Sequence, residues 1–388
     1  MEENPSSSTP IQELDTVISP SFPHELLVEI LSRLPVKSLV KFKCVSRTWL
    51  SLISSSQFIK THLEISSNKD DFHHRGMIFN YPYAPPISPP HLKQCSLQSA
   101  LDAPSVNEVI GIDFSVNGRY ALVWVVGCFD GLVCIASVRN GLFLWNPSIR
   151  KSKKLPDMNV KYNSGRSILF GFGYDKLNDD YKVVGIFCVF SGAAVSKTLV
   201  EVYSLKTDSW KRIEDFKGGF PFDFGKYVNG KLHWATRNDF KSRKHSWKIV
   251  SLDLGNETYG EVERLDYGEG VDHWSFDVLG GCLSVLCNYK RIRADVWVMK
   301  EYGVRDSWTK VISIPYLDSP AEYRYNRPIC LLRNGEILLN YGSRLVLYNP
   351  RNNTFKFSQI NNFQKVNMYV ESLVSPNACG GGQRQHHY

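Results

Sequence analysis

The chain has 388 residues, of which 43% are hydrophobic and 22% charged, and its formal net charge is +8. This length allows two or more domains of ordinary globular composition, and the longest apolar run, at 121–126, is far too short to cross a bilayer. The positive excess lies in short clusters at 150–154, 241–244 and 290–293 rather than on one element, so we expect neither a nucleic-acid nor a membrane partner.

The nine cysteines predict a reducing compartment and no metal site. None of them forms a CxxC pair, no histidine stands at zinc-finger spacing from a pair, and most fall in apolar runs where a thiol behaves as a small hydrophobe. The first fifteen residues are acidic and polar, unlike a signal or transit peptide. We therefore expect a cytoplasmic or nuclear protein, or one found in both compartments.

The chain begins with residues 1–19, which carry four acids and no bases and are expected to be disordered. Residues 20–64 are the strongly helical part: apolar side chains recur at helical spacing over 26–34, and Pro35 interrupts the run. Pro23 suits a first helical turn, and Ser46 suits the N-cap of a helix containing Trp49. Three or four short helices are predicted, too few to bury all their apolar side chains internally.

This helical stretch resembles an F-box, in the pieces FP (22–23), ELL (25–27), EIL (29–31), LPVKSL (34–39) and CVSRTW (44–49). It departs from the family at Phe22, where leucine is usual. The resemblance implies docking on an SKP-type adaptor and, through it, on the cullin and RING subunits of a ubiquitin ligase. The side chains expected to contact the adaptor are Phe22, Pro23, Leu26, Leu27, Ile30, Leu31, Leu34, Pro35, Leu39, Val45 and Trp49. The alternative is a helical subdomain that packs only on its own chain.

Beyond a joint at 65–76, residues 77–375 show short apolar runs separated by Gly, Asn and Asp, which is typical of β-strands. A two-strand unit recurs around Trp145, Tyr203, Leu252, Trp297 and Tyr348, at intervals of about fifty residues. In three units an aromatic residue follows seven positions later, as a hairpin would place it. Residues 77–79 with 95–97 form a degraded first copy.

Six such units predict a kelch-like β-propeller of about six blades, whose ring closes when 366–374 pairs with the first blade. A β-sandwich without repeats is the structural alternative. The tail, 376–388, is expected to be disordered.

The β region resembles the F-box-associated interaction domain of plant F-box proteins, a group that includes F-box/kelch and S-locus F-box relatives. The motifs that carry the resemblance are CFDGL (128–132), LWNP (144–147), FGFGYD (170–175), DYKVV (180–184), VYSL (202–205) with DSW (208–210), and VWVM (296–299) with SW (307–308). The resemblance implies the substrate-recognition subunit of an SCF-type ligase that captures a protein target for ubiquitination, with a target that the sequence leaves unknown.

No catalytic motif accompanies these features: GxSxG, P-loop and HExxH are all absent, so we expect no enzyme activity and no cofactor. Gly171 and Gly173 are expected in a β-turn rather than a dinucleotide loop, and His233 in the core or at a rim. The alternative function is a propeller-type carbohydrate-binding protein or hydrolase with a purely structural helical N-terminus.

The rim loops are the expected place for a substrate. Five segments are candidates there, and as a set they mix aromatic residues with Arg and Lys, the types that dominate binding hot spots. No single residue is assigned; the segments are 162–166, 220–224, 239–247, 267–274 and 323–327.

Overall fold

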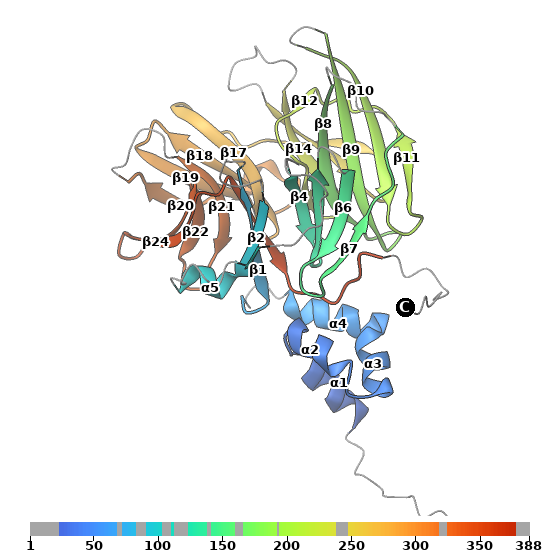
Figure 1. The fold of residues 1–388 in the computed structure, drawn as a ribbon. Helices are drawn as coiled ribbons and strands as arrows, with labels where there is room; N and C mark the ends of the chain where they lie inside the picture. Colours follow the sequence, from blue (N-terminus) through green and yellow to red (C-terminus); the bar gives the residue numbers. More distant parts are fainter. Residues whose placement is uncertain are drawn as a thin grey trace, which may run out of the picture.

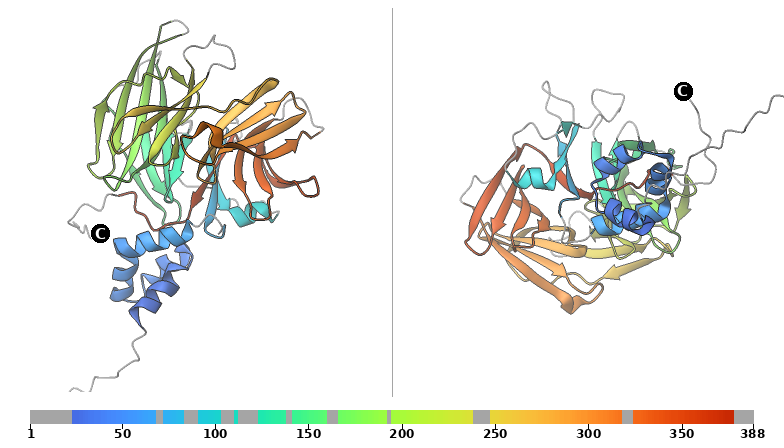
Figure 2. Two further views of the ribbon diagram at one scale, coloured as in Figure 1. Left: turned by 180° about the vertical axis from the view of Figure 1, so that it is seen from behind. Right: turned by 90° about the horizontal axis from the view of Figure 1, so that it is seen from below.

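The computed structural model describes residues 23–67, 72–82, 91–102, 110–111, 123–137, 141–159, 166–191, 194–237, 247–317 and 324–377. A helical module hangs below a ring of β-sheets (Figures 1 and 2). The segment 1–19, expected to be disordered, lies outside the described residues, and so does 376–388 except for its first two positions.

Four short helices form the module, namely α1 (His24–Ser32), α2 (Val36–Phe42), α3 (Arg47–Ser54) and α4 (Ser56–Ser66). Pro35 separates α1 from α2, and the Ser46 side chain accepts the Trp49 N–H at 3.1 Å, so the predicted N-cap is confirmed. None of the helices in the described ranges is both long and apolar enough to span a bilayer.

Six antiparallel sheets make the ring, and they are numbered here as blades in chain order. Blade 1 contains β1 (Arg75–Tyr81), β2 (His91–Ser96), β3 (Ile110–Gly111) and β25 (Lys365–Val370), with α5 (Leu97–Leu101) after β2. Blade 2 contains β4 (Val123–Phe129), β5 (Leu132–Ser137), β6 (Gly141–Asn146) and β7 (Lys151–Lys154). Blade 3 contains β8 (Arg166–Asp175), β9 (Asp180–Ser191), β10 (Ala194–Ser204) and β11 (Ser209–Ile213).

Blade 4 contains β12 (Phe220–Pro221), β13 (Lys226–Val228), β14 (Lys231–Arg237), β15 (Lys248–Asp253) and β16 (Tyr259–Val262). Blade 5 contains β17 (Val271–Leu279), β18 (Cys282–Tyr289), β19 (Arg293–Met299) and β20 (Trp308–Pro315), with a 3-10 turn, η2 (Arg305–Ser307), before β20. Blade 6 contains β21 (Tyr325–Leu331), β22 (Ile337–Tyr341), β23 (Arg344–Asn349) and β24 (Thr354–Asn361). The prediction of a six-bladed propeller is confirmed, and the β-sandwich is excluded.

The ring closes through its last strand. β25 pairs antiparallel with β1, which sets Met368 opposite Met77, so a strand from the C-terminal part completes the first blade. The predicted pairing of this segment with the first blade is therefore confirmed. Because the register also sets Lys365 opposite Asn80 and Val370 opposite Arg75, β25 runs toward the helices and delivers residues 371–374 to them (Figure 1).

The seven-residue spacing of the repeat has a direct structural cause. In the hairpins, Tyr203 lies opposite Trp210, Leu252 opposite Tyr259 and Tyr348 opposite Phe355. Three aromatic residues at this end of an outer strand also donate a hydrogen bond to a carbonyl of the preceding blade: Trp210 to Pro156 at 2.7 Å, Tyr259 to Glu214 at 2.9 Å and Trp308 to Glu263 at 3.1 Å. The repeated aromatic residue thus joins neighbouring blades.

The two glycines of FGFGYD lie in strand β8, so the β-turn expected from the sequence is wrong. A Cβ on Gly171 would lie 2.8 Å from Leu232, and one on Gly173 would lie 2.3 Å from Tyr227. Both neighbours belong to blade 4. The glycines therefore allow the inner strands of blades 3 and 4 to approach closely, and this tertiary contact explains a pattern that suggested a turn.

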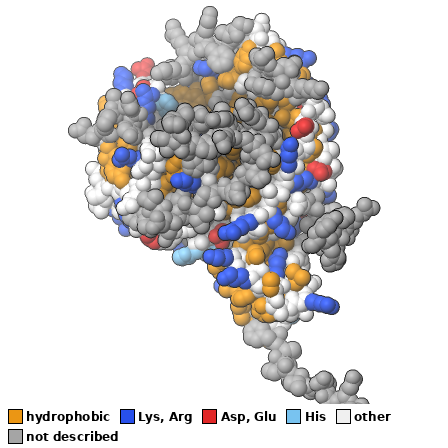
Figure 3. Space-filling view, in the orientation of Figure 1, with side chains coloured by type: hydrophobic (Ala, Val, Ile, Leu, Met, Phe, Trp, Pro, Cys, Tyr) orange, Lys and Arg blue, Asp and Glu red, His pale blue; other side chains and the backbone are white. Residues whose placement is uncertain are grey.

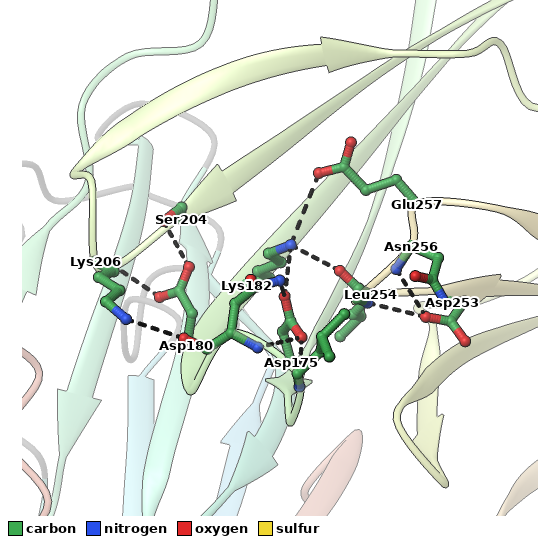
Figure 4. A network of polar contacts seen from close by, with 12 residues as sticks. Asp175, Asp180, Lys182, Ser204, Lys206, Asp253, Leu254, Asn256 and Glu257 are labelled. Carbon is green, nitrogen blue, oxygen red and sulfur yellow. Dashed lines mark hydrogen bonds and ion pairs between the residues drawn. The ribbon is translucent and has the colours of Figure 1, made fainter.

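A buried polar network next to these glycines joins the same two blades (Figure 4). The Lys182 ammonium forms an ion pair with Asp175 at 2.9 Å, donates to the Leu254 carbonyl at 2.7 Å and lies 3.7 Å from Glu257. Asp180, at the start of β9, accepts the Lys206 N–H at 2.9 Å. The motifs FGFGYD and DYKVV are thus scaffold, because their polar residues hold the hairpin and the blade junction.

His233 is fully buried in blade 4 and is therefore a core histidine. From its burial we predict that the protein loses stability in mild acid. Its ring nitrogens lie 3.1 Å from the Lys226 carbonyl and 2.7 Å from the Tyr302 hydroxyl, which satisfies a neutral imidazole. Burial lowers the pKa of His233 from 6.5 to about 4. Between these values the unfolded chain binds more protons, so the free energy of unfolding falls as the pH falls.

For this histidine alone the expected loss between pH 7 and pH 5 is about 2 kcal/mol. Urea unfolding of the native chain and of His233→Gln at both pH values measures it, because the variant should lose that share of the pH dependence. The exposed His24, replaced in His24→Gln, is the matched control. Equal pH dependence in the native chain and His233→Gln would contradict the assignment.

Candidate functional site

The helical module exposes an apolar surface, which we call the outer face. Three of its side chains belong to the predicted adaptor contacts, Leu26, Ile30 and Val45, which are 48%, 51% and 61% exposed. Val40 and Leu50 are also exposed on the module but are not among the predicted contacts. Figure 3 shows apolar side chains on the part of the module that points away from the ring. An apolar group of this kind on a small helical unit is typical of a protein-binding surface.

The other predicted contacts occupy different positions. Leu31 and Leu39 are buried in the core of the module, where they pack with Ile53 and Phe58. Leu27, Leu34 and Trp49 are partly buried against that core, Pro23 and Pro35 are exposed, and Phe22 lies outside the described residues. In the described chain Leu31 and Leu39 therefore hold the module together, and the exposed residues are the ones placed to meet a partner.

The opposite side of the module is attached to the propeller. Leu373, delivered by β25, is buried in the same core as Leu31 and Leu39, and Ile149 packs against that core from the turn before β7. Lys60 on α4 forms an ion pair with Asp179 at 3.2 Å. Burial at this junction raises the pKa of Glu371, although the backbone N–H of Val36, at the N-terminus of α2, favours the carboxylate. These contacts fix the orientation of the outer face relative to the ring.

A pocket of about 390 Å³ is lined by Gln364 and Lys365, where β25 begins at its end remote from the helices; we call it the distal pocket. Three of the five predicted rim segments meet there: 220–224 provides Phe222, Asp223 and Phe224, 267–274 provides His273 and Trp274, and 323–327 provides Asn326 and Arg327. Of the other two segments, only Arg166 and Trp247 belong to the described residues. The ring thus brings together segments that lie as much as a hundred residues apart in the sequence.

One wall of the distal pocket is aromatic. Trp274 stacks on Trp247 with ring centroids 4.2 Å apart, and Phe222 meets Trp274 edge-on at 5.5 Å. The Arg237 guanidinium lies over Phe222, 4.9 Å from the ring centre. Aromatic rings held in this way offer a rigid apolar surface to a ligand.

The floor of the distal pocket is a chain of alternating charges. Lys365 contacts both carboxylate oxygens of Asp223, at 2.8 and 2.9 Å. Lys226 lies 3.5 Å from Asp223 and from Asp277, and Arg327 forms an ion pair with Asp277 at 2.9 Å. Although burial favours the neutral acid, the charges of Lys226 and Lys365 outweigh it and hold the pKa of Asp223 well below its usual range. This set of three cations and two anions has one excess positive charge.

A second cavity, of about 600 Å³, lies nearer the helices, and its lining includes two titratable groups with raised pKa values. Burial raises the pKa of Cys128 to about 12, so this thiol is protonated at neutral pH. Burial raises the pKa of Asp130 to about 6, although Tyr181 donates to its carboxylate. The other acid lining the cavity, Asp277, is paired with Arg327. Each of the two carboxyl groups in this lining thus has a fixed partner, Tyr181 for Asp130 and Arg327 for Asp277.

The described residues contain no group of three or more His, Cys, Asp or Glu side chains that could hold a metal ion. What the distal pocket offers instead is shape, an aromatic wall and fixed charge. These are the properties of a binding site.

Comparison with known proteins identifies both parts of the chain. Residues 20–61 match the F-box domain, and residues 92–376 match the F-box associated beta propeller domain. An F-box/kelch-repeat protein of Arabidopsis thaliana is 34% identical over 380 residues, which cover 92% of this chain and 96% of that protein. A second Arabidopsis thaliana F-box protein is 30% identical over 398 residues, 87% of each chain, and F-box protein CPR1 of the same plant is 28% identical over 386 residues, 91% of this chain and 89% of CPR1.

An F-box indicates binding to an SKP-type adaptor, and its combination with a propeller supports the general role of a substrate adaptor in an SCF complex. Such subunits are generally non-catalytic. With the helical module, the six-bladed ring and these matches along nearly its whole length, the chain belongs to the F-box proteins that carry an F-box associated β-propeller.

Proposed function

We propose that this chain is the substrate-recognition subunit of an SCF-type cullin–RING ubiquitin ligase, with the outer face bound to an SKP-type adaptor and the distal pocket holding a protein target. The observation that carries the proposal is the arrangement of the two surfaces. The outer face is exposed on a module fixed to one end of the ring, and the pocket lies at the other end. A target held there is kept at a set position relative to the adaptor.

The chain itself makes and breaks no covalent bond in this proposal. It raises the effective concentration of target lysines near the ubiquitin-charged E2 that other subunits bring. We further propose that the complex works in the cytoplasm, the nucleus or both, as the arrangement of the cysteines in the sequence predicts.

Adaptor binding is tested with the double variant Leu26→Asp/Ile30→Asp. Both side chains are about half exposed, so the change should leave the fold intact while it places two charges in an apolar interface. Two hot-spot positions at roughly 2 kcal/mol each predict a loss of affinity of about a thousandfold. Co-purification and titration with a purified SKP-type adaptor measure the loss.

Ile292→Asp is the matched control, because Ile292 is 72% exposed in the turn between β18 and β19 of blade 5. It should bind the adaptor as the native chain does. Two results would contradict the proposal. One is a folded native chain that binds none of several SKP-type adaptors, and the other is a double variant that binds as tightly as the native chain.

A further inference from the structure

The distal pocket has a net positive floor that no acid among its described lining residues balances. Lys226 is shared between Asp223 and Asp277, whereas Lys365 and Arg327 stand at the two ends of the charge chain with one acid each. All of these groups except Asp223 are largely buried, and charges in such a hollow are poorly screened by solvent. The floor therefore favours a ligand that brings a negative charge.

The buried polar atoms of the same lining that have no hydrogen-bond partner among the described residues include the hydroxyl oxygen of Ser275, on β17. They also include the side-chain carbonyl oxygen of Asn340, a residue on β22 that is only 2% exposed. A serine hydroxyl can donate to a carboxylate, and an amide oxygen can accept a backbone N–H. Buried polar groups usually have hydrogen-bond partners. A peptide could supply both of the missing ones, a carboxylate for the Ser275 hydroxyl and a backbone N–H for the Asn340 oxygen.

The aromatic wall adds the third element. Phe222 is 36% exposed, and Trp274, which it contacts, is held in place by Trp247. Wall and floor line the same pocket. If a peptide lays an apolar side chain on the wall, an acidic residue next to it in the peptide can reach the floor. Wall and floor together match a short segment with two adjacent residues of different character.

We propose that the distal pocket selects protein segments in which an Asp or Glu side chain stands next to an aromatic or aliphatic one. The carboxylate meets the Lys365 and Arg327 end groups and the Ser275 hydroxyl, and the apolar side chain covers Phe222 and Trp274. This inference rests on the proposed function, since it names the class of target that the same pocket would capture.

The test is a selection of random twelve-residue peptides displayed on phage against the purified full chain, without adaptor, so that its result does not depend on adaptor binding. Peptides retained by the native chain and lost with Trp274→Ala are those that use the pocket. They are expected to be enriched in Asp or Glu beside an apolar residue. A synthetic peptide from this set is then titrated by fluorescence anisotropy against each variant, after thermal melts have shown that the variants are folded.

Lys365→Met should weaken binding of this peptide tenfold to a hundredfold, as expected for a lost charge-assisted hydrogen bond. Changing the peptide's acid to its amide should weaken binding to the native chain similarly and have little further effect on Lys365→Met. Lys211→Met is the matched control, since Lys211 is an exposed lysine on the outer strand β11 of blade 3. Its affinity should equal that of the native chain.

Pocket-dependent peptides without acids, or an affinity unchanged by Lys365→Met, would overturn this inference while leaving the pocket as a target site. A phosphoserine in place of the acid that binds more than tenfold tighter would overturn it in favour of a phosphate reader. If no peptide depends on Trp274, both the inference and the pocket's part in the proposed function fall, whereas adaptor binding is judged separately.

Discussion

Lys182→Met is expected to lower the free energy of unfolding by about 3–5 kcal/mol, because it leaves a buried carboxylate without its cation. The side chain of Asp175 is 0% exposed and that of Lys182 only 9%, so water cannot replace the lost partner (Figure 4). The Leu254 carbonyl would lose its donor as well. The variant tests whether the FGFGYD and DYKVV motifs join blades 3 and 4.

Lys211→Met is a sharp control for this prediction, because Lys211 contacts the same Glu257, at 2.8 Å, from a side chain that is 71% exposed. An exposed pair of this type contributes at most about 1 kcal/mol. Urea unfolding of both variants gives the two values. The double variant Asp175→Asn/Lys182→Met should recover part of the loss, since it removes the unpaired charge. Similar values for Lys182→Met and Lys211→Met would show that burial does not decide the strength of this contact.

Asn146→Ala is expected to lower the free energy of unfolding by about 3 kcal/mol, because several buried acceptors lose one donor. The fully buried Asn146 amide donates to the Ser372 carbonyl at 3.0 Å, to the Ser372 hydroxyl at 3.1 Å and to the Val374 carbonyl at 2.8 Å. These bonds position the segment that inserts Leu373 into the helical core. The variant should therefore loosen the junction between the helical module and the ring.

Asn349 is a control within the same chain, because it precedes Pro350 just as Asn146 precedes Pro147. Asn146 and Asn349 each accept a backbone N–H two residues later, at 2.9 Å, so both shape their turns in the same way. The amide of Asn349, however, donates to the Glu336 side chain, at 2.8 Å. Asn349→Ala should cost about 1 kcal/mol, the value of an ordinary turn contact. Urea unfolding measures both, and equal losses would rule out a special role for Asn146 in holding the C-terminal segment.

Local sequence features were enough to predict most of the architecture. Pro35 and Ser46 define helix ends through short-range hydrogen bonds and sterics, and the seven-residue spacing from Tyr203 to Trp210 records a hairpin. Repetition of the unit then predicted the six blades, because each blade needs neighbours to cover its faces. The three segments that meet in the distal pocket are also among the rim loops that the sequence marks as candidates, because each is rich in aromatic residues.

Hydrophobic periodicity does not show which individual side chains are buried. Helical spacing marks Leu26, Ile30 and Leu31 alike as apolar, yet only Leu31 turns toward the core that Leu373 completes from the far end of the chain. In the same way, the two glycines of FGFGYD suggest a turn, because nothing local reveals Leu232 and Tyr227 next to them.

The sequence by itself therefore determined the helices, the hairpins, the number of blades and the family, all of which depend on neighbours in the chain or on simple repetition. Tertiary structure alone decided which apolar residues form the outer face, why Asn146 differs from Asn349, and how Lys365, Asp223 and Arg327 come to share one pocket. The physical reason is that these contacts join residues far apart in sequence, which meet only when β25 pairs with β1 and closes the ring.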